Sequence, residues 1–108
     1  MIKSINGWAF APERSLEESF ALAKNYGYEG FEIVIADAGR GTQNAVTLDS
    51  TQSDCERWRE MATKNGLQIA SVASGLGWQF PMTTDDENTR RAGIEANKKA
   101  LQIAAWLG

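Results

Sequence analysis

A threefold repeat constrains the fold of this chain more than any other feature of its sequence. Each unit has a short run rich in β-branched and apolar residues, a loop, a segment with helical spacing, and a closing glycine. The closing glycines are Gly27, Gly66 and Gly108. Glycine is favoured just after a helix because it adopts the left-handed conformation that ends helices. Strands that alternate with helices in this way form βαβ units with a parallel sheet.

The repeat predicts one α/β domain that covers residues 1–108. We expect strands at about 2–8, 30–35 and 67–73, and helices at about 15–26, 51–65 and 85–107. The intervening segment Ala36 to Leu48 is predicted to be a long polar loop.

Helix starts are marked by capping-box patterns, in which a Ser or Thr is followed three residues later by Glu. The pattern occurs at 15–18 and at 84–87. For the second helix the start is open, because Ser50 or Thr51 competes with a further S-x-x-E pattern at 53–56.

Small residues dominate the predicted buried stripe of the third helix. The helix also contains Gly93, and these small residues allow it to lie close to a sheet. The stripe consists of Ala92, Ala96, Ala100, Ile103 and Leu107.

Three such units form an arc of a parallel (β/α)8 barrel if the strands lie in sequential order, because right-handed crossovers then place every helix on one side. Eight units of this length would give roughly 320 residues, within the usual range of such barrels, so three units leave the barrel incomplete. The chain is then a fragment, or it associates with itself, or the sheet is doubly wound. A spatial order 1-2-3 indicates the barrel arc, and an order 2-1-3 indicates the doubly wound sheet.

Composition excludes several classes of function. Eleven Lys and Arg against fourteen Asp and Glu give a net charge of −3, which disfavours nucleic-acid binding. No apolar run approaches the roughly 20 residues that span a membrane, and no secretory signal is visible. The single cysteine, Cys55, cannot form an internal disulfide, so we expect a cytoplasmic protein. The chain has no histidine, which excludes Ser-His-Asp and Cys-His catalysis within it.

Two stretches of the sequence resemble xylose isomerase-like TIM barrels. Residues 27–32, Gly-Tyr-Glu-Gly-Phe-Glu, are similar to the G-F-D-x-x-E pattern at the second strand of these barrels. The third unit is similar to the sugar-phosphate epimerase and hexulose-phosphate isomerase branch, through Ser71, Phe80-Pro81, Asp86, Arg90, Gly93, Glu95, Lys99-Ala100 and Leu107-Gly108. The resemblance covers nearly the whole chain and three-eighths of the family's barrel.

The resemblance implies a metal-dependent proton transfer next to a sugar carbonyl, with Mn²⁺ or Mg²⁺ as the cofactor of the complete enzyme. The metal ligands and the acid–base carboxylates of the family belong to later strands, so no catalytic or metal-binding residue is expected in this chain. Where the phosphosugar epimerases have a histidine before the Phe-Pro pair, this chain has Gly77, so phosphorylated and non-phosphorylated substrates stay open.

Four residues are candidates for substrate binding: Trp8, Glu32, Ser74 and Trp78. Trp8 ends the first strand and offers a flat face to a sugar ring, or it packs in the barrel mouth. Glu32 lies in an apolar strand and needs a partner, so it either binds a substrate hydroxyl or forms a structural network. Alternation places it inside the barrel, opposite Ile33. Ser74 offers a hydroxyl to a sugar oxygen, and Trp78 covers a ligand, a neighbouring subunit or the rim. Ser71 is expected to be a small structural residue.

Motifs for dinucleotide, Mg²⁺ or phosphate binding are incomplete or weak in this sequence. Gly75-Leu76-Gly77 begins like a dinucleotide-binding loop, but the third glycine is replaced by Phe80. The predicted first and third strands lack the acidic residues at their ends that a phosphoacceptor domain uses to bind Mg²⁺. Arg40 offers a phosphate contact, although a solvated loop charge is the plainer interpretation.

The sequence therefore predicts the N-terminal part of a metal-dependent sugar or sugar-phosphate isomerase or epimerase, inactive alone. The alternative is a non-catalytic α/β module that associates through its open sheet. The expected partners are a small sugar or sugar phosphate and further copies of this chain, and neither a nucleic acid nor a membrane.

Overall fold

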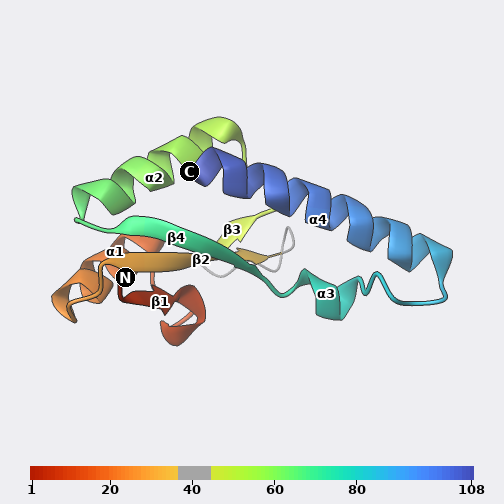
Figure 1. The fold of residues 1–108 in the computed structure, drawn as a ribbon, viewed down its shortest axis with the longest axis horizontal. Helices are drawn as coiled ribbons and strands as arrows, with labels where there is room; N and C mark the ends of the chain where they lie inside the picture. Colours follow the sequence, from red (N-terminus) through yellow and green to blue (C-terminus); the bar gives the residue numbers. More distant parts are fainter. Residues whose placement is uncertain (37–44) are drawn as a thin grey trace.

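The computed structural model describes residues 1–36 and 45–108 and shows strands and helices in alternation (Figure 1). No helix in the described part is long and apolar enough to cross a membrane. In chain order, the elements are β1 (Ser4–Asn6), the 3₁₀ helix η1 (Gly7–Ala9), α1 (Leu16–Asn25), β2 (Gly30–Ala36), β3 (Ala45–Thr47), α2 (Gln52–Lys64), β4 (Gln68–Ser74), α3 (Leu76–Gln79) and α4 (Glu87–Leu107).

The sheet is open, and all of its pairings are parallel. β4 pairs with β2 from Gly30 to Ile35. On the other edge of β2, β1 pairs with residues 30–32 and β3 pairs with residues 34–36. The three predicted strands therefore lie in the order β1-β2-β4, which confirms the barrel arc and rules out the order 2-1-3.

The short strand β3 was not predicted, because its three residues stand at the end of a long polar segment. Its pairing also shortens the first strand, which was predicted to reach Trp8. β1 ends at Asn6, and Gly7–Ala9 form a 3₁₀ helix instead.

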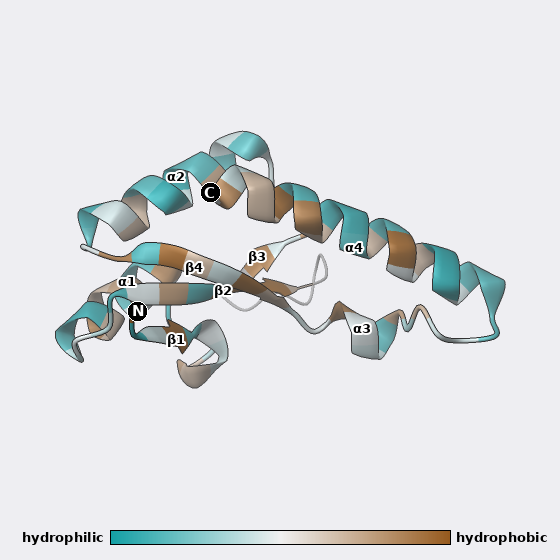
Figure 2. Ribbon diagram, viewed as in Figure 1, coloured by the Kyte–Doolittle hydropathy of each residue, from teal (hydrophilic) through white to brown (hydrophobic). Residues whose placement is uncertain are grey.

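The three long helices pack on one face of the sheet. Alternate residues of β2 bury their side chains in a core that includes residues of α1, α2 and α4. Phe20 of α1 meets the Phe31 ring edge-on, with 4.9 Å between ring centroids. In Figure 2 the apolar segments lie along β2, β3 and β4 and on parts of α4. Glu32 lies on the opposite face, as the alternation predicted.

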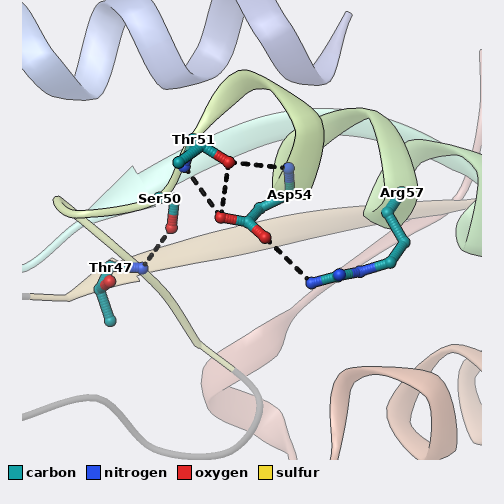
Figure 3. A network of polar contacts seen from close by, with 5 residues as sticks. All are labelled: Thr47, Ser50, Thr51, Asp54 and Arg57. Carbon is teal, nitrogen blue, oxygen red and sulfur yellow. Dashed lines mark hydrogen bonds and ion pairs between the residues drawn. The ribbon is translucent and has the colours of Figure 1, made fainter.

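Helix α1 begins as the sequence predicted. Ser15 accepts a hydrogen bond from the Glu18 backbone N–H, and the Glu18 carboxylate accepts one from the Ser15 backbone. For α2, Thr51 and Asp54 form the capping box (Figure 3). Ser50 instead accepts a hydrogen bond from the Thr47 backbone, so it closes the turn after β3.

Helix α4 begins two residues later than predicted, and the predicted box at 84–87 is wrong. Asp86 is the N-cap and accepts a hydrogen bond of 2.7 Å from the Thr89 backbone. The Thr84 hydroxyl accepts from the Asp86 backbone N–H and so shapes the turn before the helix.

The buried stripe of α4 is confirmed except at its first member. Ala92 is exposed, and Gly93 is buried. A Cβ at Gly93 would lie 2.4 Å from the Phe80 carbonyl oxygen, so the close approach predicted for Gly93 is to the 80–82 loop and not to the sheet. Figure 1 shows the reason, since this half of α4 extends past the sheet.

Candidate functional site

Three polar side chains from three neighbouring strands form a row on the face opposite the helices. Asn6 of β1 and Ser71 of β4 are the register partners of Glu32 on β2. The Asn6 Nδ2 donates to Glu32 Oε1 at 2.5 Å, and the Ser71 Oγ donates to Glu32 Oε2 at 2.7 Å. Each carboxylate oxygen therefore has its own donor. We call Asn6, Glu32 and Ser71 the polar row.

The polar row keeps Glu32 ionised. The hydrogen bond from Ser71, followed by that from Asn6, lowers the pKa of Glu32, while partial burial opposes the shift. Hydrogen bonds to a carboxylate favour its charged form. The row therefore presents a negative charge with fixed orientation.

A groove of about 170 Å³ lies at the carboxyl ends of the strands. Its walls come from η1, β2 and the segment that follows β4, and it is lined by Trp8, Val34, Ile35, Ala36, Gly75, Leu76 and Gln79. Trp8 is 61% exposed. A Cβ added at Gly75 would lie 3.7 Å from the indole, so the ring lies beside that backbone. Val34 shares the inner face with Glu32, whereas Ile35 lies on the helix face, so the groove spans the end of β2 and its Val34 wall lies on the side of the polar row.

The structure places the other two predicted site residues away from the polar row. The Ser74 hydroxyl accepts a hydrogen bond of 3.3 Å from the Leu76 backbone N–H, so it shapes the start of α3. Trp78 lies on α3 and is 96% exposed, and it does not line the groove, whereas its neighbours Leu76 and Gln79 do. Substrate binding by Ser74 and Trp78 stays a prediction.

Two further expectations concern charged groups. Arg40 lies outside the described residues. Within 1–36 and 45–108, no three His, Cys, Asp or Glu side chains come together to hold a metal ion. These residues therefore do not fit the divalent ion that the family resemblance implies, and Glu32 contributes to the site as an isolated, hydrogen-bonded carboxylate.

Asn6 is the site residue that sequence reasoning missed. Its type carried a signal, because Asn is favoured at the residue before a helix, and Gly7–Ala9 form a short 3₁₀ helix. Its role beside Glu32 depends on strand register, which the sequence does not reveal. Ser71 was expected to be only a small structural residue, and it is a donor to Glu32.

Comparison with known proteins agrees with the barrel-arc fold. The family model of the xylose isomerase-like TIM barrel matches residues 20–108, which is most of the chain. No curated protein matches the sequence. In barrels of this type, active sites lie at the carboxyl ends of the strands, where the groove beside Trp8 is found. The chain belongs to the xylose isomerase-like TIM barrel family.

Proposed function

We propose that this chain forms the sugar-binding part of a cytoplasmic isomerase or epimerase that moves a proton next to a carbonyl. The observation that carries the proposal is the ionised Glu32, fixed by the polar row on the inner face of the sheet, where Val34 also lines the groove beside Trp8. Family membership supports the location, since barrel enzymes bind substrate at this end of the strands.

Glu32 would accept hydrogen bonds from sugar hydroxyls. An ionised carboxylate offers about four lone-pair directions, and the two donors of the polar row use two of them. Hydrogen bonds to a charged acceptor are stronger than those between neutral groups. A fixed carboxylate therefore selects ligands that present hydroxyl donors.

Trp8 would cover the apolar C–H face of the sugar. The indole is largely exposed at the groove, and it has a flat apolar surface with a polar edge. One such ring beside a fixed carboxylate matches a ligand with one apolar face and a rim of hydroxyls. We extend the proposal to Ser74 and Trp78 as outer contacts.

The proposal assigns substrate binding to this chain and assigns the proton transfer elsewhere. We attribute the Mn²⁺ or Mg²⁺ of the family and its acid–base carboxylates to no residue described here.

Deuterium exchange tests the proposal. The protein that contains this chain would be incubated with Mn²⁺ in D₂O with a panel of ketoses and ketose phosphates, and the C–H signals next to the carbonyl would be followed by proton NMR. We expect exchange with at least one sugar, and a loss of about tenfold or more in the Trp8→Ala variant, since 1.4 kcal/mol of lost binding corresponds to a factor of ten. The control is Tyr26→Ala, an exposed aromatic at the end of α1. No exchange with any sugar of the panel, or equal losses in both variants, would contradict the proposal.

Self-association of the open sheet is a second candidate. β4 pairs with β2 along one edge, and within the described residues no strand pairs with its other edge. The strand has no charged residue, and unprotected edges of this kind invite pairing with another chain. A groove of about 210 Å³ between β4 and the end of α4 lies beside this edge.

Sedimentation equilibrium tests this second candidate. We expect the chain to form a homodimer and Ala70→Lys, which places a charge on the open edge, to be monomeric. Ser53→Lys on the exposed surface of α2 is the control and should not change the mass. A compact monomer of the unmodified chain at high concentration would exclude association through β4.

A further inference from the structure

Asn6 makes two hydrogen bonds that join the two parts of the candidate site. Its Oδ1 accepts from the Trp8 backbone N–H at 2.7 Å, and its Nδ2 donates to Glu32 Oε1 at 2.5 Å. We propose that Asn6 is a positioning residue that fixes the groove-lining Trp8 with its side-chain oxygen and the Glu32 carboxylate with its side-chain nitrogen. The inference deepens the proposed function, and its relevance to ligand binding rests on it.

The end of the strand explains why one residue has both tasks. β1 pairs with β2 only as far as Glu32, because β3 occupies the same edge of β2 from Val34 onward. The chain must therefore leave the sheet after Asn6, and it does so as the 3₁₀ helix that carries Trp8. Asn6 is therefore both the last residue of β1 that pairs with β2 and the N-cap of this 3₁₀ helix.

The chemistry of the amide suits both partners in one orientation. The carboxylate needs a donor and the backbone N–H needs an acceptor, so a flipped amide would face like groups on both sides. Aspartate has no N–H for Glu32, and serine caps the turn but is too short to span to the carboxylate. Among these common capping residues, asparagine alone serves both contacts.

Backbone packing leaves the turn little freedom to move. Gly7 is buried, and a Cβ added there would lie 3.1 Å from a Val34 methyl carbon and 3.5 Å from the Glu32 carbonyl oxygen. The main chain of η1 is therefore pressed against β2 directly after Asn6. A change at Asn6 then transmits to Trp8, which is two residues further on.

Within residues 1–36 and 45–108, the side chains that hydrogen-bond to Glu32 carry no titrating group. Glu32 faces Asn6 from β1 and Ser71 from β4, and neither side chain titrates. The carboxylate signal of Glu32 therefore reports on its two hydrogen bonds.

Three variants of the full chain separate the two tasks without any ligand. Glu32 is followed by carbon-13 NMR of its carboxyl carbon during a pH titration, and Trp8 is followed by its indole N–H resonance, assigned with Trp8→Phe. Asn6→Asp keeps the acceptor for Trp8 and places a second carboxylate beside Glu32, so the pKa of Glu32 should rise by about one pH unit or more, with the Trp8 signal unchanged. Asn6→Ser should keep the Trp8 signal and raise the pKa of Glu32 by a smaller amount. Asn6→Ala should alter both signals.

Ser15→Ala is the matched control, since it removes an N-cap hydrogen bond from α1 without touching the polar row. Unchanged Glu32 and Trp8 signals in Asn6→Ala, or equal shifts in Ser15→Ala, would overturn the assignment. If Asn6→Ala fails to fold, the Asp and Ser variants still decide it, because both retain a cap.

Ligand binding then gives a separate readout. For any sugar that the exchange experiment identifies, Asn6→Ser should bind about fivefold more weakly, the loss expected for one hydrogen bond of about 1 kcal/mol. If no sugar binds at all, the proposed function fails, while the titrations still decide the positioning role. Unchanged affinity in Asn6→Ser alongside shifted titrations would confine Asn6 to a structural role and overturn its part in recognition.

Discussion

Ser71 and Glu32 are 39 residues apart in the sequence, yet their side chains meet at 2.7 Å on adjacent strands. The contact depends on an irregularity in the sheet. Phe31 is paired with Ile69, and Glu32 is paired with Ser71, so the register shifts by one residue between them. Without the shift, the methyl group of Ala70 would face the carboxylate, and Glu32 would lose a donor.

Removing the Glu32 charge and removing its side chain should have different effects on stability. In Glu32→Gln, the amide oxygen can accept from Asn6 and the amide nitrogen can donate to the Ser71 hydroxyl, so the free energy of unfolding should change by less than about 0.5 kcal/mol. Glu32→Ala leaves both partners without the carboxylate and should cost about 1–2 kcal/mol. Urea denaturation at neutral pH measures both. In the complete protein, Glu32→Gln should reduce turnover far more than stability, and unchanged turnover would make Glu32 structural.

Gly93→Ala should destabilise the protein although alanine favours helices. The added Cβ would lie 2.4 Å from the Phe80 carbonyl oxygen, which belongs to the backbone and cannot easily move. We expect a loss of about 1–3 kcal/mol, as for other overpacked sites. The control is Gly77→Ala in α3, where a Cβ would meet nothing within 4 Å. Thermal unfolding should separate the two variants, and a stabilised Gly93→Ala would show that the helix does not lie against the loop.

The sequence offers both Thr51 and Ser53 as the N-cap of the second helix, and substitutions show which of them stabilises it. Thr51→Ala removes the side chain that accepts from Asp54 N, so unfolding should become easier by about 1 kcal/mol. Ser53 is exposed, and Ser53→Ala should change stability by less than about 0.5 kcal/mol. Chemical denaturation of both variants is the measurement. Equal effects would contradict the box seen in Figure 3.

Acid should weaken the fold through the helix-capping carboxylates. Hydrogen bonds at the helix starts lower the pKa of Glu18 (from Ser15), of Asp54 (from Thr51) and of Asp86 (from Thr89). A carboxylate with a lowered folded-state pKa stabilises the protein above its unfolded-state pKa, and this stabilisation is lost as the pH falls through the folded-state value. The urea midpoint should therefore fall between about pH 5 and pH 2, the range in which such carboxylates take up protons.

A variant pair tests the origin of this acid sensitivity. Glu18→Gln should flatten the dependence of the urea midpoint on pH, because it removes one of the titrating caps. Ser53→Ala, at an exposed position of α2 that carries no titrating group, is the control and should leave the slope unchanged. Identical slopes in both variants would show that the caps do not set the acid response.

Trp78 and Trp106 should differ sharply in their effect on stability. Trp78 is 96% exposed, so Trp78→Ala should change the free energy of unfolding by less than about 0.5 kcal/mol. Trp106 packs against the core and lies under the Lys99 ammonium at 4.6 Å, so Trp106→Ala should cost about 2–3 kcal/mol. A large loss in Trp78→Ala would favour the interpretation of Trp78 as a cap over the rim.

Local signals in the sequence determined most of the secondary structure. The glycines at 27 and 66 adopt positive φ angles of 77° and 72° just after the helices, as their positions predicted. The capping box at Ser15 and the burial of alternate residues in β2 follow from the same short-range rules. These features depend on neighbours within about one helical turn, so composition and spacing are sufficient to find them.

Tertiary structure alone decided which side chains meet at the site. Alternation in the sequence predicts Glu32 on the inner face. The shifted register of β4 makes Ser71 its partner, and the pairing of β3 with β2 limits the first strand to residues up to Asn6. These outcomes depend on pairings between segments that are distant in the chain, where a slip of one residue exchanges the two faces of a strand. No local pattern carries that information, and so the polar row is visible only in the folded molecule.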